Sequence, residues 1–202
     1  AEGAVLLRNY RHALPLEEGC RVAVFGRNQL HYYRCGIGSG GMVNSAYVVS
    51  ILDALKADSD IVLNQAVLSA YEAWHEAHPL EGCNEWGEEP WSQAEMPLPE
   101  ALVQQAAKTS DAALICIGRT AGEDHDSSAA PGSFLLTEEE ERTIRLVCRY
   151  FPRSIVVLNT AGIIDMTWVK RCNPAAILYV WHGGQEGGNG AADVLTGRVN
   201  PC

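Results

Sequence analysis

The chain has 202 residues, of which 47% are hydrophobic, and this is enough for one well-packed domain spanning residues 1–202. Fifteen basic residues against twenty-five acidic ones give a net charge of −10, which argues against nucleic acid and anionic membranes as partners. No apolar run approaches the roughly 20 residues of a membrane span. Seven widely spaced cysteines without a Cys-x-x-Cys pair favour free thiols and a cytoplasmic location.

The predicted elements alternate between strand and helix. In chain order we expect a strand at 21–26, helices at 45–57, 63–78 and 99–109, a strand at 112–118, a helix at 138–150, and strands at 154–159 and 175–181. The strand segments are continuously apolar, which is typical of strands covered on both faces. The alternation predicts a three-layer α/β/α sandwich of flavodoxin-like type, with a mainly parallel sheet of about five to six strands.

Two local patterns refine this prediction. Thr137 followed by Glu140 is a Thr-x-x-Glu capping box, and it predicts the start of the helix at 138–150. Residues 81–100 contain prolines, acidic residues and two tryptophans, and they predict an irregular arm over the surface.

The loops that follow the strands are the expected binding region. In a parallel sheet these loops share the carboxyl edge, where ligands usually bind. Two of them, "CGIGSGG" and "HGGQEGGNG", are rich in glycine, so their backbones can approach a neighbour or a ligand closely. The loop at 119–136 is longer than the roughly 12 to 15 residues common in compact domains, and it carries the acidic segment at 123–126.

Other candidate sites receive little support. His75, His78 and Cys83 offer three potential metal ligands, but their spacing matches no metal motif, so we predict no metal and no cofactor. No Gly-x-Ser-x-Gly nucleophile elbow occurs between a strand and a helix. The tryptophans at 86 and 91 are expected to pack in the fold, whereas Trp181 ends a strand at the binding edge.

Several segments, in order, resemble one known family. They are "EGAVLLRN", "VAVFG", "GIGSGG", "GRTAGEDHD", "FLLTEEEERTI", "VVLNTAGIIDMTW" and "WHGGQEGGNGAADVLTGRVNP". Together they are similar to the second, α/β-sandwich domain of family 3 glycoside hydrolases of the β-glucosidase and β-xylosidase type. The resemblance runs from Glu2 to Pro201.

The resemblance implies a catalytic role for one carboxylate. In that family a TIM-barrel domain carries the aspartate nucleophile, and many members supply the general acid/base from a sandwich loop with a "GEG.DR"-like motif. "GEDHDS" places Glu123 at the acid/base position, but Asp124 stands where glycine is common and Ser127 where arginine is common. Asp124 and Asp126 are nearby anions that would favour the protonated form of Glu123.

The resemblance also predicts the carbohydrate contacts and the partner domain. We expect substrate contacts from Arg119, Asp124, Asp126 and Trp181. Because the sequence contains no barrel with its nucleophile, we expect an excised domain of a larger glycoside hydrolase. That domain alone would be inactive, since a retaining enzyme needs two carboxyl groups.

Two alternatives remain open at this stage. A flavodoxin-like module could bind a flavin or nucleotide phosphate at "GIGSGG", if those glycines joined a helix N-terminus directly. Alternatively, the domain could be a scaffold that braces the barrel of an enzyme whose acid comes from elsewhere.

Overall fold

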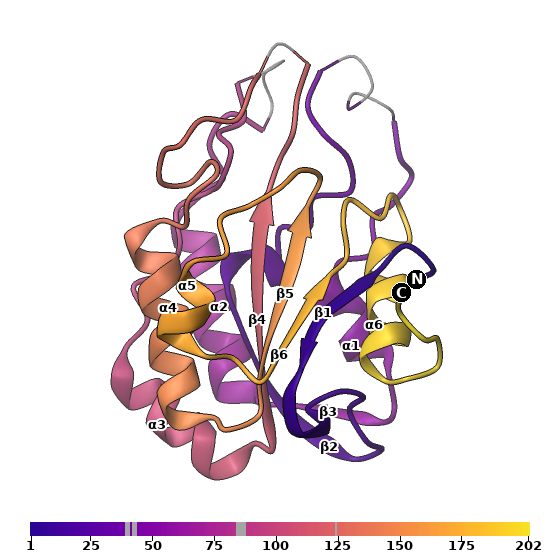
Figure 1. Cartoon of the computed structure of the whole chain (residues 1–202), viewed down its shortest axis with the longest axis vertical. Helices are drawn as coiled ribbons and strands as arrows, with labels where there is room; N and C mark the ends of the chain where they lie inside the picture. Colours follow the sequence, from indigo (N-terminus) through magenta and orange to yellow (C-terminus); the bar gives the residue numbers. More distant parts are fainter. Residues whose placement is uncertain (39–40, 42–43, 84–87, 124) are drawn as a thin grey trace.

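The sheet has six strands in the order β1-β6-β5-β4-β2-β3 (Figure 1). The computed structural model describes residues 1–38, 41, 44–83, 88–123 and 125–202. Neighbouring strands are parallel except at one edge, where β1 runs antiparallel to β6. The strands are β1 (Val5–Asn9), β2 (Cys20–Phe25), β3 (Ile61–Leu63), β4 (Ala112–Arg119), β5 (Ser154–Thr160) and β6 (Ala176–Tyr179). The predicted mainly parallel sheet is confirmed.

Helices cover both faces of this sheet. Helices α1 (Ile51–Ala57) and α6 (Gly187–Leu195) lie on one face. The other face is covered by α2 (Gln65–Ala77), α3 (Glu100–Thr109), α4 (Glu138–Tyr150) and α5 (Trp168–Cys172). Successive strand residues point to opposite faces, so Leu114 joins the first core and Ile115 the second. The three-layer α/β/α sandwich is confirmed (Figure 1).

Capping side chains fix where two helices begin. Glu140 N donates to Thr137 Oγ1 over 3.1 Å, and Thr137 N donates back to Glu140 Oε2 over 2.8 Å, so the predicted capping box of α4 is confirmed. Ser50 and Asp53 form a second capping box. Because of this cap, α1 begins at Ile51 rather than at the predicted residue 45.

The structure also contains elements that the sequence patterns did not predict. Strands β1 and β3 lie at the two edges of the sheet and are short, so neither has the continuous apolar run of a central strand. The predicted helix at 63–78 is preceded by β3, and the Asn64 side chain caps the first turn of α2. Helix α6 begins inside the predicted glycine-rich loop at 182–189, because six of its nine residues pack as buried residues on the core.

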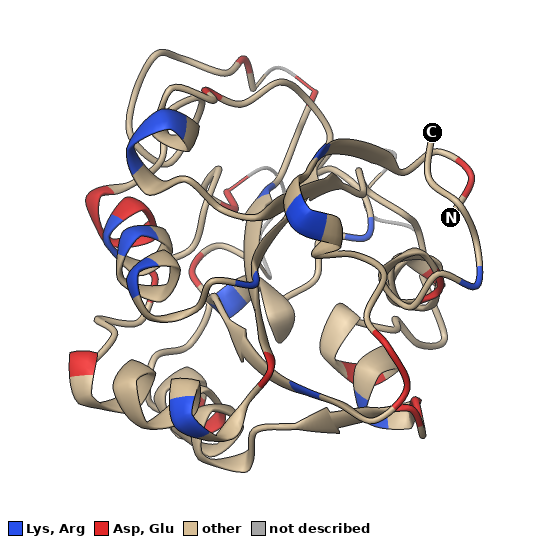
Figure 2. Ribbon diagram, turned by 60° about the horizontal axis from the view of Figure 1, so that its bottom comes forward, with Lys and Arg blue, Asp and Glu red and all other residues tan. Residues whose placement is uncertain are grey.

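Charged residues of both signs are interspersed over the ribbon (Figure 2). None of the helices in the described part of the chain is long and apolar enough to span a bilayer.

Candidate functional site

The loop after β4 lies against the glycine-rich loop after β2 at the carboxyl edge of the sheet. Ile37 N donates to Ala121 O over 2.5 Å, and Ile37 forms a parallel bridge with Gly122. Glycine is required at this crossing, because a Cβ on Gly36 would lie 2.3 Å from Ala121 O and one on Gly122 would lie 2.3 Å from Ile37 Cγ1. Both loops lie where the strand pattern predicts.

Glu123 is exposed on this loop. The glycine-rich loop passes directly beside it, since a Cβ on Gly38 would lie 3.2 Å from Glu123 Cβ. Asp126 is also exposed, and Asp124 lies outside the described residues. The His125 ring packs 4.8 Å from the Trp91 ring, which joins the loop to the irregular arm.

Arg119, at the end of β4, holds the two ends of this loop together. Its guanidinium forms a bidentate salt bridge with Glu140, with distances of 2.6 Å from Nη1 to Oε1 and 2.7 Å from Nη2 to Oε2. Both side chains are buried. The same guanidinium donates to the carbonyl oxygens of Gly118, Ser133 and Leu135. These bonds use all five of its N–H groups. Arg119 was predicted to contact substrate. In the structure it connects the two ends of the loop, and all of its N–H groups are used in these hydrogen bonds.

Asn159, near the end of β5, joins two further loops to the sheet. The residue is fully buried. Its Nδ2 donates to Tyr33 O over 2.9 Å and to Trp181 O over 2.6 Å, and its Oδ1 accepts from Tyr33 N over 2.8 Å and from Asn28 Nδ2 over 3.1 Å. Sequence reasoning missed this residue, although an asparagine closing an apolar run was a usable signal.

Trp181 and His182 continue the edge beyond β6. Trp181 is 42% exposed, and its backbone has a φ of 59°, which is rare for a bulky residue and marks local strain. Its Nε1 donates to Gly3 O over 2.7 Å, so the ring is fixed against the N-terminal segment. His182 Nε2 lies 2.8 Å from Arg119 O, and this nitrogen carries the proton because a carbonyl oxygen can only accept a hydrogen bond. Burial lowers the pKa of His182.

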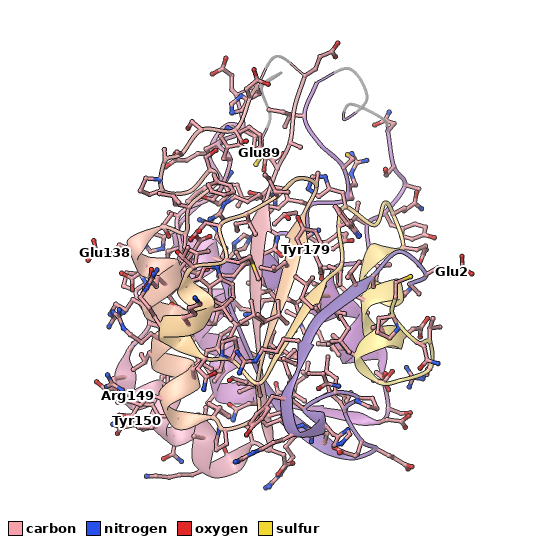
Figure 3. The ribbon with its side chains drawn as sticks, in the orientation of Figure 1. Glu2, Glu89, Glu138, Arg149, Tyr150 and Tyr179 are labelled. Carbon is pink, nitrogen blue, oxygen red and sulfur yellow. The ribbon has the colours of Figure 1, made fainter. Side chains whose placement is uncertain are left out.

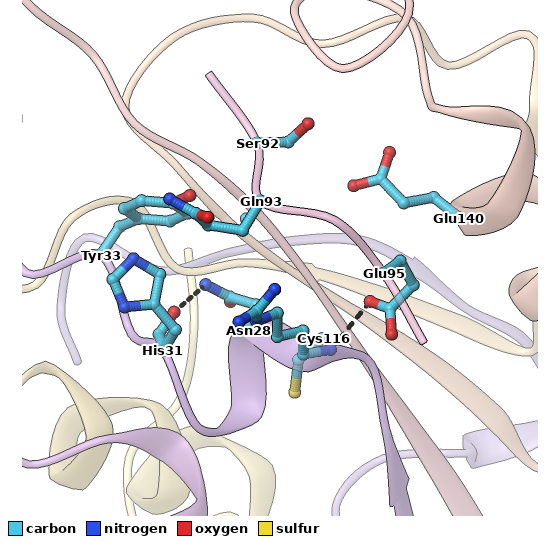
Figure 4. A pocket seen from close by; sticks show the side chains of 10 residues that line it. Asn28, His31, Tyr33, Ser92, Gln93, Glu95, Cys116 and Glu140 are labelled. Atoms are coloured by element: carbon cyan, nitrogen blue, oxygen red, sulfur yellow. Dashed lines mark hydrogen bonds between the residues drawn. The ribbon is translucent and has the colours of Figure 1, made fainter. Parts of the chain in front are cut away.

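A small polar cavity lies below these loops (Figure 4). Glu95 lines it and accepts hydrogen bonds from Arg27 N and Met96 N, each over 2.8 Å. Desolvation of this carboxyl group raises the pKa of Glu95 to about 7. Glu95 could not be predicted as a site residue from the sequence, because it lies inside the irregular arm.

The described residues of this region do not form the phosphate site that a nucleotide-binding module would require. The glycines of "GIGSGG" end at Gly41, whereas α1 begins at Ile51. The first turn of α1 is capped by the Ser50 side chain. A Cβ on Gly188 would lie 2.1 Å from Ser50 O, so α6 packs closely against the same place. The two features that this alternative needed are therefore separated along the chain.

These observations define an α/β-sandwich domain whose carboxyl-edge loops are fastened by buried polar side chains and present an exposed glutamate. The family model described as "Glycosyl hydrolase family 3 C-terminal domain" matches residues 4–202. The chain belongs to this family.

Known relatives agree with this assignment. The chain is 48% identical to a β-glucosidase of Ruminococcus albus, with 100% of this chain and 21% of that protein aligned. It is 33% identical to β-glucosidase A of Butyrivibrio fibrisolvens, over 99% of this chain and 26% of that protein. The chain therefore spans about a fifth to a quarter of these relatives.

Solved structures match the fold closely. A β-glucosidase from Paenibacillus barengoltzii superposes with a TM-score of 0.95 at 44% identity, over 98% of this chain and 22% of that one. β-Glucosidase 3B from Thermotoga neapolitana, solved in complex with glucose, gives a TM-score of 0.85 at 33% identity, over 98% of this chain and 28% of that one.

Proposed function

We propose that this domain acts within a β-glucosidase and supplies the general acid/base from the loop at 119–136, with Glu123 in that role. The observation that carries the proposal is the position of Glu123: it is exposed at the carboxyl edge, beside the glycine-rich loop, on a segment whose base is fastened by Arg119. The names of the relatives support the substrate class, a β-glucoside.

The chemistry requires a second carboxyl group from outside this domain. A retaining glycosidase places two carboxyl groups about 5 to 5.5 Å apart, one as nucleophile and one as acid/base. The acid protonates the leaving oxygen, and afterwards, as a carboxylate, it removes a proton from the attacking water. A barrel domain facing the carboxyl edge would provide the nucleophile, and the sandwich alone would be inactive.

Asp126 and Trp181 are the exposed side chains proposed to contact the sugar, together with Asp124. Asp126 lies three residues beyond Glu123, and Trp181 presents an aromatic face at the end of β6. The free state of all seven cysteines supports a reducing compartment such as the cytoplasm.

The test is Glu123→Ala in the full-length enzyme. Removal of a general acid slows poor leaving groups most, so hydrolysis of a disaccharide should fall by about 10² to 10⁴-fold. Aryl glucosides with acidic phenols should lose much less in their first step. Azide needs no deprotonation, so it should restore turnover of these activated substrates and yield a glycosyl azide.

Asp126→Ala is the matched control, because it removes a second exposed carboxylate from the same loop without removing the acid. It should change KM or the pH profile and show no azide rescue. If Glu123→Ala slows both substrate types equally and azide has no effect, the acid/base lies elsewhere. The domain would then be a scaffold that braces the barrel.

A further inference from the structure

A cluster of three potential metal ligands lies where the irregular arm meets the loop after β2. His31 Nε2 is 2.8 Å from Glu89 Oε1, and Cys83 Sγ is 3.4 Å from the same oxygen. The ligand atoms of these three residues all lie within 4.8 Å of one another. Glu89 lies beyond the carboxyl ends of the strands (Figure 3). Because His31 is far from the other two in sequence, residue spacing gave no sign of this cluster.

The cluster is supported by a further polar side chain. Gln93 Nε2 donates to Cys83 Sγ over 3.5 Å and to Glu81 O over 2.8 Å, so its amide is fixed beside the sulfur. Burial alone would raise the pKa of Glu89, but hydrogen bonds from His31, Cys83 and Gln93 lower it. The result is a carboxylate held in its charged form with only 14% of its side chain exposed.

A cavity of about 20 Å³ adjoins the cluster, and His31 and Gln93 line it (Figure 4). This volume is enough for one water molecule. Two buried polar atoms on residues that line the cavity, Tyr33 Oη and Asn28 Oδ1, have no hydrogen-bond partner among the described residues. Buried polar atoms are nearly always paired, so these two atoms are candidate partners for a water molecule in this space.

We propose that His31, Cys83 and Glu89 bind one Zn²⁺ ion, with a water molecule from the adjoining cavity as the fourth ligand. Imidazole, thiolate and carboxylate are all zinc ligands, and three protein ligands with one water complete a tetrahedral site. Zinc bonds of about 2.0 to 2.3 Å place tetrahedral ligand atoms about 3.4 to 3.6 Å apart. The pair formed by His31 and Glu89 therefore opens by roughly half an ångström, which is within the reach of side-chain rotation.

Zinc binding exchanges protons for the metal. Cys83 is exposed as a residue, but desolvation of its sulfur and then the Glu89 carboxylate raise the pKa of the thiol to about 12, so the metal-free thiol is protonated. The ion replaces the Sγ–H bond by a Zn–S bond and releases one proton to solvent. His31 binds through Nε2, so the proton that this nitrogen donates to Glu89 in the metal-free site moves to Nδ1 by exchange with solvent, with no net release of a proton from the ring.

The ion would fasten the arm to the loop after β2. The arm in turn contacts the base of the loop at 119–136, since Thr120 N donates to Trp91 O over 3.0 Å. Of the three potential ligands considered in the sequence, only Cys83 belongs to this site. His75 contacts Arg27, and His78 stacks on Trp74 at a distance of 4.4 Å between ring centroids.

The first experiment uses the reduced 202-residue chain without any substitution. Co²⁺ is added as a spectroscopic probe, and Zn²⁺ affinity is measured by competition with a chromophoric chelator. We expect one equivalent of metal, a thiolate-to-cobalt charge-transfer band and the intense visible bands of a tetrahedral site. The midpoint of thermal unfolding should rise with Zn²⁺ concentration. A spectrum without thiolate ligation would overturn the proposal.

Substitutions then locate the ion. Cys83→Ser, His31→Gln and Glu89→Gln should each weaken zinc affinity by more than the roughly 10- to 100-fold expected for the supporting change Gln93→Ala. Cys202→Ser and His78→Gln remove an exposed thiol and an exposed imidazole outside the cluster, and they should leave affinity unchanged. Equal losses in the controls, or binding that survives Cys83→Ser, would show an adventitious ion only.

Discussion

Replacing Arg119 by methionine tests whether the buried ion pair holds the loop at 119–136 in place. The substitution keeps most of the side-chain volume and removes every donor of the guanidinium. It leaves the Glu140 carboxylate buried, with a side chain only 6% exposed and without its ion-pair partner. Three backbone carbonyl groups, those of Gly118, Ser133 and Leu135, also lose a donor.

The expected cost follows from these contacts. Breaking a buried ion pair by removing one partner typically costs about 3 to 5 kcal/mol, because an uncompensated charge remains. Each lost hydrogen bond from the charged guanidinium to a carbonyl group adds about 1.5 to 3 kcal/mol where water cannot replace it. Arg119→Met should therefore lower the free energy of unfolding by at least about 3 kcal/mol, a large share of the roughly 5 to 15 kcal/mol typical of a domain.

The assay is urea unfolding of the wild type, Arg119→Met, Glu140→Leu and the double variant. Two apolar side chains of similar volume often replace a buried ion pair with little loss of stability, so the double variant should be more stable than Arg119→Met. The double-mutant cycle isolates this coupling. Arg21→Met is the matched control, since its ion pair with Asp111 is exposed and should contribute at most about 1 kcal/mol.

The reasoning is refuted if Arg119→Met costs no more than Arg21→Met, or if the cycle shows no coupling between Arg119 and Glu140. Hydrogen exchange adds a second readout. With Arg119 replaced, amide protons of the segment 128–135 should exchange faster in the double variant than in the wild type, even where global stability has recovered.

Two further predictions concern buried polar groups below the site. Burial raises the pKa of Glu95 to about 7, from about 4.3 for an exposed glutamate, so the folded state binds more protons than the unfolded state between these values. Stability should therefore fall by about 2 kcal/mol from pH 5 to pH 8. Urea unfolding of Glu95→Gln should lack this decrease. An identical pH profile in both proteins would contradict the assignment. Asn159→Leu removes four hydrogen bonds and should cost about 2 to 4 kcal/mol, with faster exchange of the Tyr33 amide proton. Asn159→Asp keeps the oxygen that accepts from Tyr33 N, so the Tyr33 amide proton should exchange more slowly in this variant than in Asn159→Leu. Equal exchange rates in the two variants would contradict the assignment.

The central part of the fold could be predicted from sequence because its signal is local. The strand β4 is buried at every position, so its apolar run is continuous, and Thr137 with Glu140 marks the start of α4 within four residues. The edge strands β1 and β3 could not be predicted in this way. Their pairing with β6 and β2 depends on residues distant in sequence. No residue of β1 is buried, and in β3 only Ile61 is.

The candidate site was predicted in its position and less well in its contacts. The alternation of strands and helices places Glu123 at the carboxyl edge, and this requires only topology. The pairing of Arg119 with Glu140 requires contact between the end of β4 and the first turn of α4. Because the two residues are 21 positions apart, no local sequence pattern predicts this contact. Arg119 was expected to contact substrate, and the structure shows its buried ion pair with Glu140, which sequence reasoning did not predict.

The distribution of polar contacts bears on the proposed acid/base role of this loop. The buried hydrogen bonds lie at its base, where Arg119 binds the segment at 133–135, and on the neighbouring loops, where Asn159 joins Tyr33 to Trp181. Near Glu123, by contrast, the two loops approach through glycine backbone: a Cβ on Gly122 would clash with Ile37 Cγ1 at 2.3 Å, and one on Gly38 would lie in tight contact with Glu123 Cβ at 3.2 Å. A carboxyl group that must first donate a proton to a sugar oxygen and then accept one from water has two requirements. The ends of its loop must be held in place, and the middle of the loop must be accessible to substrate. A larger residue at Gly122 would displace the middle of the loop while leaving its ends in place, so the two requirements are met by different residues of one loop.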